Sequence, residues 1–168
     1  MNSSAKSDER FVMDFSAQCP EFGLRTQCGD DADFLMALFI ACSPLVATLP
    51  TAMAEQQARF QNMGHEASHP NASRFIVQSG GHPVGRIVID WNTDGESHCV
   101  DIALNPETQG NGVGTKLLLA WVRESSLLQR DASLQVLSDN PAFALYKRLG
   151  FVETEASDQP AVTMRLKA

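Results

Sequence analysis

Residues 109–116, QGNGVGTK, place three glycines directly before the apolar run Leu117, Leu118 and Leu119. A glycine-rich turn that opens a helix exposes backbone N–H groups at the positive end of the helix dipole, and both features favour a bound anion. Glycine also lets the main chain come close to a phosphate because it has no Cβ atom. The segment therefore predicts a phosphate-binding turn.

Two common phosphate-binding motifs do not fit this turn. A P-loop needs lysine followed by serine or threonine after its last glycine, whereas here Thr115 precedes Lys116. A dinucleotide-binding fingerprint, G-x-G-x-x-G, needs a third glycine where this chain has Thr115, and it belongs to the first turn of a βαβ unit. Only hairpins are expected before residue 109. The pattern that remains is Q-x-x-G-x-G, from Gln109 to Gly114.

In this setting the sequence resembles the GNAT superfamily of N-acetyltransferases, whose pyrophosphate signature is [RQ]-x-x-G-x-[GA] between a strand and a long helix. Upstream, residues 100–107, VDIALNPE, resemble the central strand of the family. Downstream, residues 140–151, NPAFALYKRLGF, resemble its second motif, which ends in L-Y-x-x-L-G-F. The resemblance covers about residues 22–166, and two motifs in the right order are more specific than either alone.

The resemblance implies acetyl-CoA as the acetyl donor and no metal. Its diphosphate would lie on the glycine turn, where Gln109 can hydrogen-bond but adds no charge. Backbone groups of the central strand would pair with the pantetheine arm, and the Leu104 N–H would polarise the thioester carbonyl. The implied cofactor-binding residues are Ala103, Leu104, Gln109, Gly110, Asn111, Gly112, Val113, Gly114, Thr115, Asn140, Phe143 and Tyr146.

Tyr146 matches the general acid of the family, because a phenol can protonate the departing thiolate. The alternative is a packing tyrosine whose hydroxyl only reaches the cofactor. No motif indicates the base that deprotonates the acceptor. His98 and Glu96 rank first, Asp101 falls on the opposite face of the strand from His98 unless a bulge intervenes, and water can serve instead. Cys99 is interpreted as a buried structural thiol.

Hydrophobic periodicity predicts the elements that position these residues. The predicted class is α/β (α+β) in a single domain: a mixed, mostly antiparallel sheet of six or seven strands flanked by four helices, the GNAT fold. Residues 1–20 are interpreted as a poorly ordered arm in which 11–15 can pack, and 21–168 as the GNAT domain. The predicted strands are 24–27, 74–78, 84–91, 97–104, 132–137, 151–154 and 161–166, and the predicted helices begin near 30, 51, 113 and 140.

The composition argues against some classes of binding partner. A formal net charge of −7 argues against nucleic acid and anionic membranes as main partners. Four cysteines without metal-knuckle spacing, and an N-terminus without a secretory leader, favour a cytoplasmic protein with reduced thiols. Residues 65–69, HEASH, match the zinc-protease pattern, but Gly64 and Pro70 flank them, so a polar loop is predicted. A homodimer is left open.

The predicted function is transfer of an acetyl group from acetyl-CoA to a primary amine of an unidentified small or peptide acceptor. The amine would attack the thioester directly in a ternary complex. The acceptor amine is expected to bind opposite the cofactor, between the first two helices and the hairpin of residues 87–100. The alternative is a non-catalytic acyl-CoA sensor or regulatory module of the same fold.

Overall fold

Seven strands form one sheet in the order β1-β2-β3-β4-β5-β7-β6. The computed structural model describes residues 3–154 and 161–168. The strands are β1 (Phe22–Thr26), β2 (Ser73–Ser79), β3 (His82–Thr93), β4 (Glu96–Leu104), β5 (Ala132–Leu137), β6 (Val152–Glu153) and β7 (Ala161–Leu166). The helices are α1 (Ser3–Gln18), α2 (Ala32–Cys42), α3 (Pro44–Ala47), α4 (Thr51–Ser68), α5 (Val113–Leu127) and α6 (Ala142–Arg148), with a 3-10 turn at Gly29–Asp31.

The sheet confirms the predicted mixed, mostly antiparallel architecture. All seven predicted strands are present, and β4–β5 is the one parallel pair among the described strands, joined by the crossover helix α5. The hairpin link between β2 and β3 uses Gly80 and Gly81 at φ +56° and +83°, a conformation that glycine adopts without strain. The described residues contain six α-helices instead of the four expected, because α1 and α3 were not predicted.

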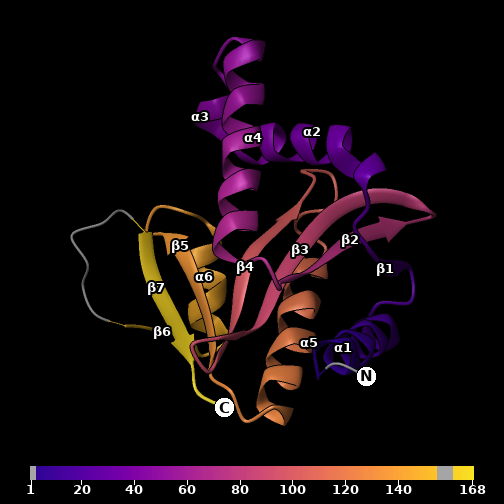
Figure 1. Cartoon of the computed structure of the whole chain (residues 1–168), viewed down its shortest axis with the longest axis vertical. Helices are drawn as coiled ribbons and strands as arrows, with labels where there is room; N and C mark the ends of the chain where they lie inside the picture. Colours follow the sequence, from indigo (N-terminus) through magenta and orange to yellow (C-terminus); the bar gives the residue numbers. More distant parts are fainter. Residues whose placement is uncertain (1–2, 155–160) are drawn as a thin grey trace.

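Helices cover both faces of the sheet, as Figure 1 shows. On one face, Leu117, Leu118 and Trp121 recur at helical spacing on α5 and pack into a buried cluster with Ile87 and Ile89 of β3. On the other face, α4 and α2 cover the alternate residues of the strands, with Ala54 and Ala58 of α4 and Leu38 of α2 buried. Strands β4 and β5 lie at the centre of this arrangement.

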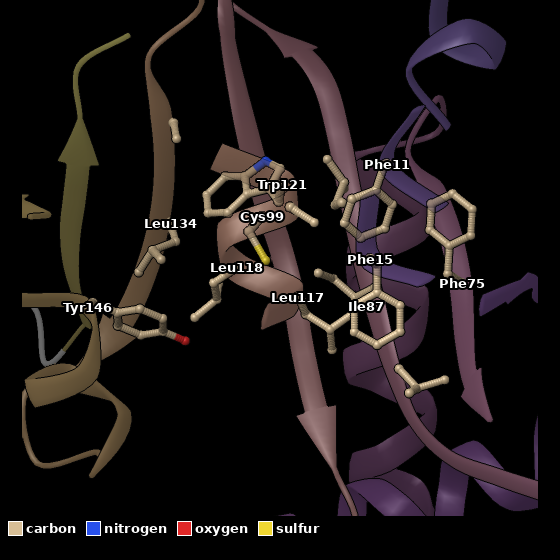
Figure 2. Close-up of a cluster of buried hydrophobic side chains, with 14 of the residues drawn as sticks. Phe11, Phe15, Phe75, Ile87, Cys99, Leu117, Leu118, Trp121, Leu134 and Tyr146 are labelled. Atoms are coloured by element: carbon tan, nitrogen blue, oxygen red, sulfur yellow. The ribbon is translucent and has the colours of Figure 1, made fainter. Parts of the chain in front are cut away.

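The N-terminal segment is a helix, so the prediction of a poorly ordered arm is wrong for residues 3–18; residues 1 and 2 lie outside the described part. Phe11 and Phe15, one turn apart on α1, are fully buried. Phe11 contacts the rings of Phe75 and Trp91 at centroid distances of 5.4 and 5.9 Å. Figure 2 shows both phenylalanines facing the sheet and α5. The polar composition of the arm concealed this single apolar face.

The buried face of α1 predicts a large effect on stability. Phe15→Ala is expected to lower the free energy of unfolding by about 3–5 kcal/mol, because it removes a buried ring and leaves a cavity. Met13→Ala, on the exposed side of the same helix, should change it by less than about 0.5 kcal/mol. Chemical denaturation of both variants measures the difference. Equal stabilities would show that α1 does not belong to the core.

Helix α4 is longer than predicted. Gly64 was expected to end it and 65–69 to form a polar loop, but α4 continues through His65 to Ser68. A glycine inside a helix costs only about 1 kcal/mol relative to alanine, which the contacts of the last turn offset. The helix ends before His69, the residue that precedes Pro70. The φ of −130° and ψ of 66° of His69 lie outside the helical region, as expected for a residue before proline.

Candidate active site

A cleft opens where β4 and β5 separate. Their parallel pairing is limited to Ser97↔Ala132, His98↔Ser133 and Cys99↔Leu134, and beyond these residues the strands diverge. The cleft has a volume of about 300 Å³, within the range of small-molecule sites. It is lined by Gln61 and His65 of α4, Cys99, Val100, Asp101 and Ile102 of β4, Leu134, Gln135, Val136 and Leu137 of β5, and Asn140 and Tyr146.

A β-bulge at Val100 decides which side chains of β4 share a face. Val88 pairs with Asp101 while the next residue, Ile89, pairs with Cys99, so Val100 is the extra residue. Cys99 points into the core beneath α5. His98 and Asp101 both point to the α4 face, where each contacts side chains of that face. The simple alternation that separated His98 from Asp101 therefore fails at the bulge.

The backbone of Leu104 faces the diverging edge of β4. The Asn105 N–H donates to the Val84 carbonyl at 2.8 Å, and hydrogen-bonded pairs alternate with non-bonded pairs in an antiparallel ladder. Leu104 is therefore a non-bonded pair with Gly85, and its N–H points away from β3. By the same alternation the Ala103 N–H points towards β3, whereas the Ile102 N–H, which the sequence did not single out, points away from β3; the pairing of Ala103 and Leu104 with the pantetheine arm stays a prediction.

The glycine turn lies between the end of β4 and α5, as predicted. Gly110 and Gly112 both have φ +78°, a conformation that favours glycine, and α5 begins at Val113. The first N–H that bonds back to the turn is that of Lys116, which donates to the Gly112 carbonyl at 3.1 Å. The N–H groups of 113–115 thus stand at the helix start without an acceptor within the helix. This arrangement fits a diphosphate.

Two polar side chains of the turn bond to the protein itself. Gln109 Nε2 donates to the Leu104 carbonyl at 2.8 Å and lies 3.8 Å from Cys42 Sγ, so in this structure it ties the turn to the end of β4. Asn111 Nδ2 donates to the Thr108 carbonyl at 3.5 Å. Both side chains therefore brace the turn whose backbone N–H groups are exposed, and their contact with the cofactor stays a prediction.

Tyr146 is buried and lines the cleft from α6. Its ring packs edge-on against Phe151 at 6.1 Å, and Figure 2 shows its hydroxyl directed from α6 towards the space between β5 and β4. Burial raises the pKa of Tyr146 above the usual phenol value, with smaller contributions from Cys99 and Asp101. In the described part of the chain this hydroxyl has no hydrogen-bond partner, so it is a free donor facing the cleft.

The residues around Tyr146 have structural contacts of their own. Asn140 Oδ1 accepts the Ala142 N–H at 2.9 Å, a capping contact made from the residue before the N-cap Pro141 instead of from the N-cap position that was expected. Phe143 is half-buried, with Lys147 Nζ 4.7 Å from its ring centroid. Asn140 also lines the cleft, so capping does not prevent a contact with a ligand.

The thiol of Cys99 is fully enclosed at the root of the cleft. Burial raises its pKa far above the usual thiol value, and the neighbouring charge of Asp101 acts in the same direction. The thiolate is the nucleophilic form of cysteine, and here it is strongly disfavoured. This supports the interpretation of Cys99 as a structural thiol.

Neither favoured base candidate lines the cleft. His98 Nδ1 lies 2.9 Å from Ser133 Oγ, and its ring stacks on His69 at 5.3 Å. Burial lowers the pKa of His98, and the neighbouring His69 lowers it further. Glu96 forms an ion pair with Arg165 of β7. The structure therefore directs both side chains to protein partners, away from the reacting groups.

A buried network not found from the sequence borders the acceptor side of the cleft. Arg86 of β3 donates from Nε to Asp101 Oδ2 at 2.9 Å, and its Nη2 lies 2.8 Å from the same oxygen as an ion pair. Its Nη1 donates to Asn62 Oδ1 at 3.0 Å, and its Nη2 lies 3.5 Å from His65 Nδ1. The sequence conceals this network, because Gly64 and Pro70 predict a loop at 65–69 and alternation predicts that Asp101 lies on the face of β4 opposite His98.

The second histidine of the zinc-like pattern is also occupied by protein groups. His69 Nδ1 lies 3.0 Å from Asp90 Oδ2, while His65 faces Arg86. Over residues 3–154 and 161–168, no group of three or more His, Cys, Asp or Glu side chains is placed to hold a metal ion.

The fold and the site together define an acetyl-transfer scaffold, and sequence comparison places the chain within it. The model of the Acetyltransferase (GNAT) family matches residues 33–151, so this chain belongs to the GNAT acetyltransferase family. GNAT enzymes use acetyl-CoA, and the glycine turn and the cleft fit it. No helix in the described part of the chain combines the length and apolarity needed to cross a bilayer.

Individual relatives agree with this assignment. Mycothiol acetyltransferase of Saccharomonospora viridis is 37% identical over 98 residues, 55% of this chain and 26% of that protein, so the chain spans about a quarter of this relative. PH1933 of Pyrococcus horikoshii has a similar structure, with a TM-score of 0.73 and 18% identity over 88% of this chain and 99% of that one. The PaiA N-acetyltransferase of Thermoplasma acidophilum, solved with coenzyme A, has a TM-score of 0.69 and 16% identity over the same shares.

Proposed function

We propose that this chain transfers an acetyl group from acetyl-CoA to a primary amine by direct attack, without a covalent enzyme intermediate. One observation carries the proposal. The N–H groups at the start of α5 have no acceptor within the helix, the Leu104 N–H points away from β3, and the Tyr146 hydroxyl faces the cleft without a hydrogen-bond partner in the described part of the chain. An anion cradle, an oxyanion donor and a proton donor are the groups that thioester aminolysis requires.

The proposed reaction divides among these groups. The amine nitrogen attacks the thioester carbon, and the Leu104 N–H stabilises the developing oxyanion; one such donor contributes roughly 10²–10³ in rate. As the C–S bond breaks, Tyr146 donates its proton to the departing sulfur. Burial raises the pKa of Tyr146, so the phenol stays protonated and can act as the donor.

The acceptor must lose a proton before it attacks. His98 and Glu96 are bonded to protein groups outside the cleft, and Asp101 is paired with Arg86. We therefore assign proton removal to water in the open cleft.

A thiol-release assay over a panel of primary amines tests the function. We expect acetyl-CoA-dependent CoA release with at least one amine, and a mass gain of one acetyl group on that amine. Binding of acetyl-CoA measured by calorimetry is the companion experiment. Tight binding without turnover on any amine would contradict the transfer reaction and favour an acyl-CoA sensor.

A further inference from the structure

The charges that line the cleft are few and unevenly distributed. Asp101 is the one carboxylate among the lining residues, and no lysine or arginine side chain lines the cleft in the described part of the chain. The other polar lining residues, Gln61, Gln135 and Asn140, are uncharged. The acceptor therefore meets a site with one negative group and no exposed cation.

Arg86, the nearest cation, is not available to a ligand. Its side chain is 8% exposed, and it is held by Asp101, Asn62 and His65. Both contacts to Asp101 use the same carboxylate oxygen, Oδ2, which leaves Oδ1 for a ligand. Arg86 therefore orients Asp101 and ties β3 and β4 to α4.

His65 adds no positive charge to the cleft. Burial lowers its pKa, and the charge of Arg86 lowers it further, against the opposing effect of Asp101. With Arg86 directed at Nδ1, the neutral ring carries its proton on Nε2, since a donor facing Nδ1 requires a lone pair there. His65 is thus a neutral donor in the wall of the cleft.

We propose that the α4 side of this cleft, lined by Asp101, Gln61 and His65, is the acceptor site of the proposed acetyl transfer and selects primary amines without a carboxylate beside the reacting nitrogen. Asp101 binds the ammonium group, and Arg86 is the positioning residue that orients Asp101. A carboxylate on the acceptor would lie near Asp101 without a free cation to pair with, and unpaired like charges at a binding site are strongly disfavoured. The proposal rests on the proposed function for its reaction but concerns recognition, which can be measured separately.

Matched pairs of amines and amino acids test the selection. Tyramine against tyrosine, and ethanolamine against serine, differ only by the carboxylate. In the thiol-release assay we expect kcat/KM to be about tenfold or more higher for the amine of each pair, a modest cost for an unpaired charge. Equal values, or a preference for the amino acids, would overturn the proposal.

The variant Asp101→Asn tests whether Asp101 causes the preference for amines over amino acids. This variant should raise KM for the amine, leave KM for acetyl-CoA unchanged, and reduce the preference within each pair to less than about threefold. Asp94→Asn is the matched control: Asp94 is exposed in the β3–β4 turn, and asparagine tolerates its φ of +50°. The control should behave as the wild type. An unchanged preference in Asp101→Asn would overturn the assignment.

Arg86→Gln tests the positioning role, with Arg86→Lys as the conservative variant. We expect Arg86→Gln to raise KM for the amine and to reduce the preference for the amine over its amino acid. Arg86→Lys should keep part of that preference. KM for acetyl-CoA should stay constant in both variants. A purely structural arginine would instead lower stability and affect both substrates together. That outcome would remove Arg86 from the proposal.

Calorimetry tests the proposed preference for amines separately from the proposed acetyl transfer, because it measures binding without turnover. Tyramine and tyrosine are titrated into wild-type protein saturated with CoA. Stronger binding of tyramine without turnover would reject the proposed function and keep the selection. Equal binding of the two, or no binding of either, would overturn the selection even if other amines were acetylated.

Discussion

Replacing Gly112 with alanine is expected to weaken acetyl-CoA binding about tenfold or more. Gly112 is the residue before α5 and has φ +78°, where a Cβ atom is strained by roughly 1–2 kcal/mol. Relief of that strain rotates the N–H groups at the helix start, and each anion contact there is worth roughly 0.3–2 kcal/mol. Calorimetric titration with acetyl-CoA measures the loss.

Gly95→Ala is the control that distinguishes the effect of backbone strain on stability from the loss of acetyl-CoA affinity. Gly95 has φ +87°, and no atom lies within 4 Å of the position that a Cβ atom would occupy, which is also the situation of Gly112. Gly95, however, lies at the other end of β4. Both variants should lose similar stability, and only Gly112→Ala should lose affinity. Equal affinities in the two variants would show that the glycine turn does not hold the diphosphate.

Replacing Tyr146 with phenylalanine is expected to lower kcat by roughly 10²–10⁴, the usual contribution of a positioned general acid. Acetyl-CoA affinity and the free energy of unfolding should change little, because phenylalanine keeps the contact with Phe151 and the hydroxyl has no hydrogen-bond partner in the described part of the chain. Steady-state kinetics and calorimetry give the two readouts. A kcat within about threefold of wild type would assign the proton donor to another group.

The pH dependence gives a second test of Tyr146. A general acid must be protonated, so activity falls as pH rises through its pKa, and a raised pKa moves that fall to higher pH. No descending limb from this group is expected below about pH 10, the usual phenol value. Tyr146 is the only tyrosine in the chain, so phenolate absorbance reports its titration directly. Titration of the folded protein below about pH 10 would contradict the burial.

Local motifs predicted the parts of the site that depend on neighbouring residues. The glycine turn, its place between β4 and α5, and the capping of α6 by Asn140 all follow from residues close together in the chain. Strand positions were also predictable, since alternation along a strand is a local pattern. The assignments of Tyr146 as general acid and of Leu104 as oxyanion donor stay predictions, although Tyr146 lines the cleft.

Features that depend on distant contacts were missed. Helix α1 is held by Phe11 and Phe15, which are buried in the core. Residues 11–15 were expected to be able to pack, but the polar residues around them concealed the helix. Helix α4 continues through Gly64, and Arg86 of β3 contacts Asn62 and His65 on either side of that glycine. The bulge at Val100 places His98 and Asp101 on the same face of β4, whereas strict alternation predicts opposite faces.

The sequence by itself determined the family, the order of the strands along the chain and the anion-binding turn, because each depends on short local patterns of glycine, apolar and capping residues. Only the tertiary structure decided which polar side chains meet at the acceptor side. The pairing of Arg86 with Asp101, and of both with α4, depends on one extra residue in β4 and on a helix more than 30 residues away from Asp101 in the chain. Such contacts leave no periodic signal, because register and long-range packing are settled only when the whole sheet forms.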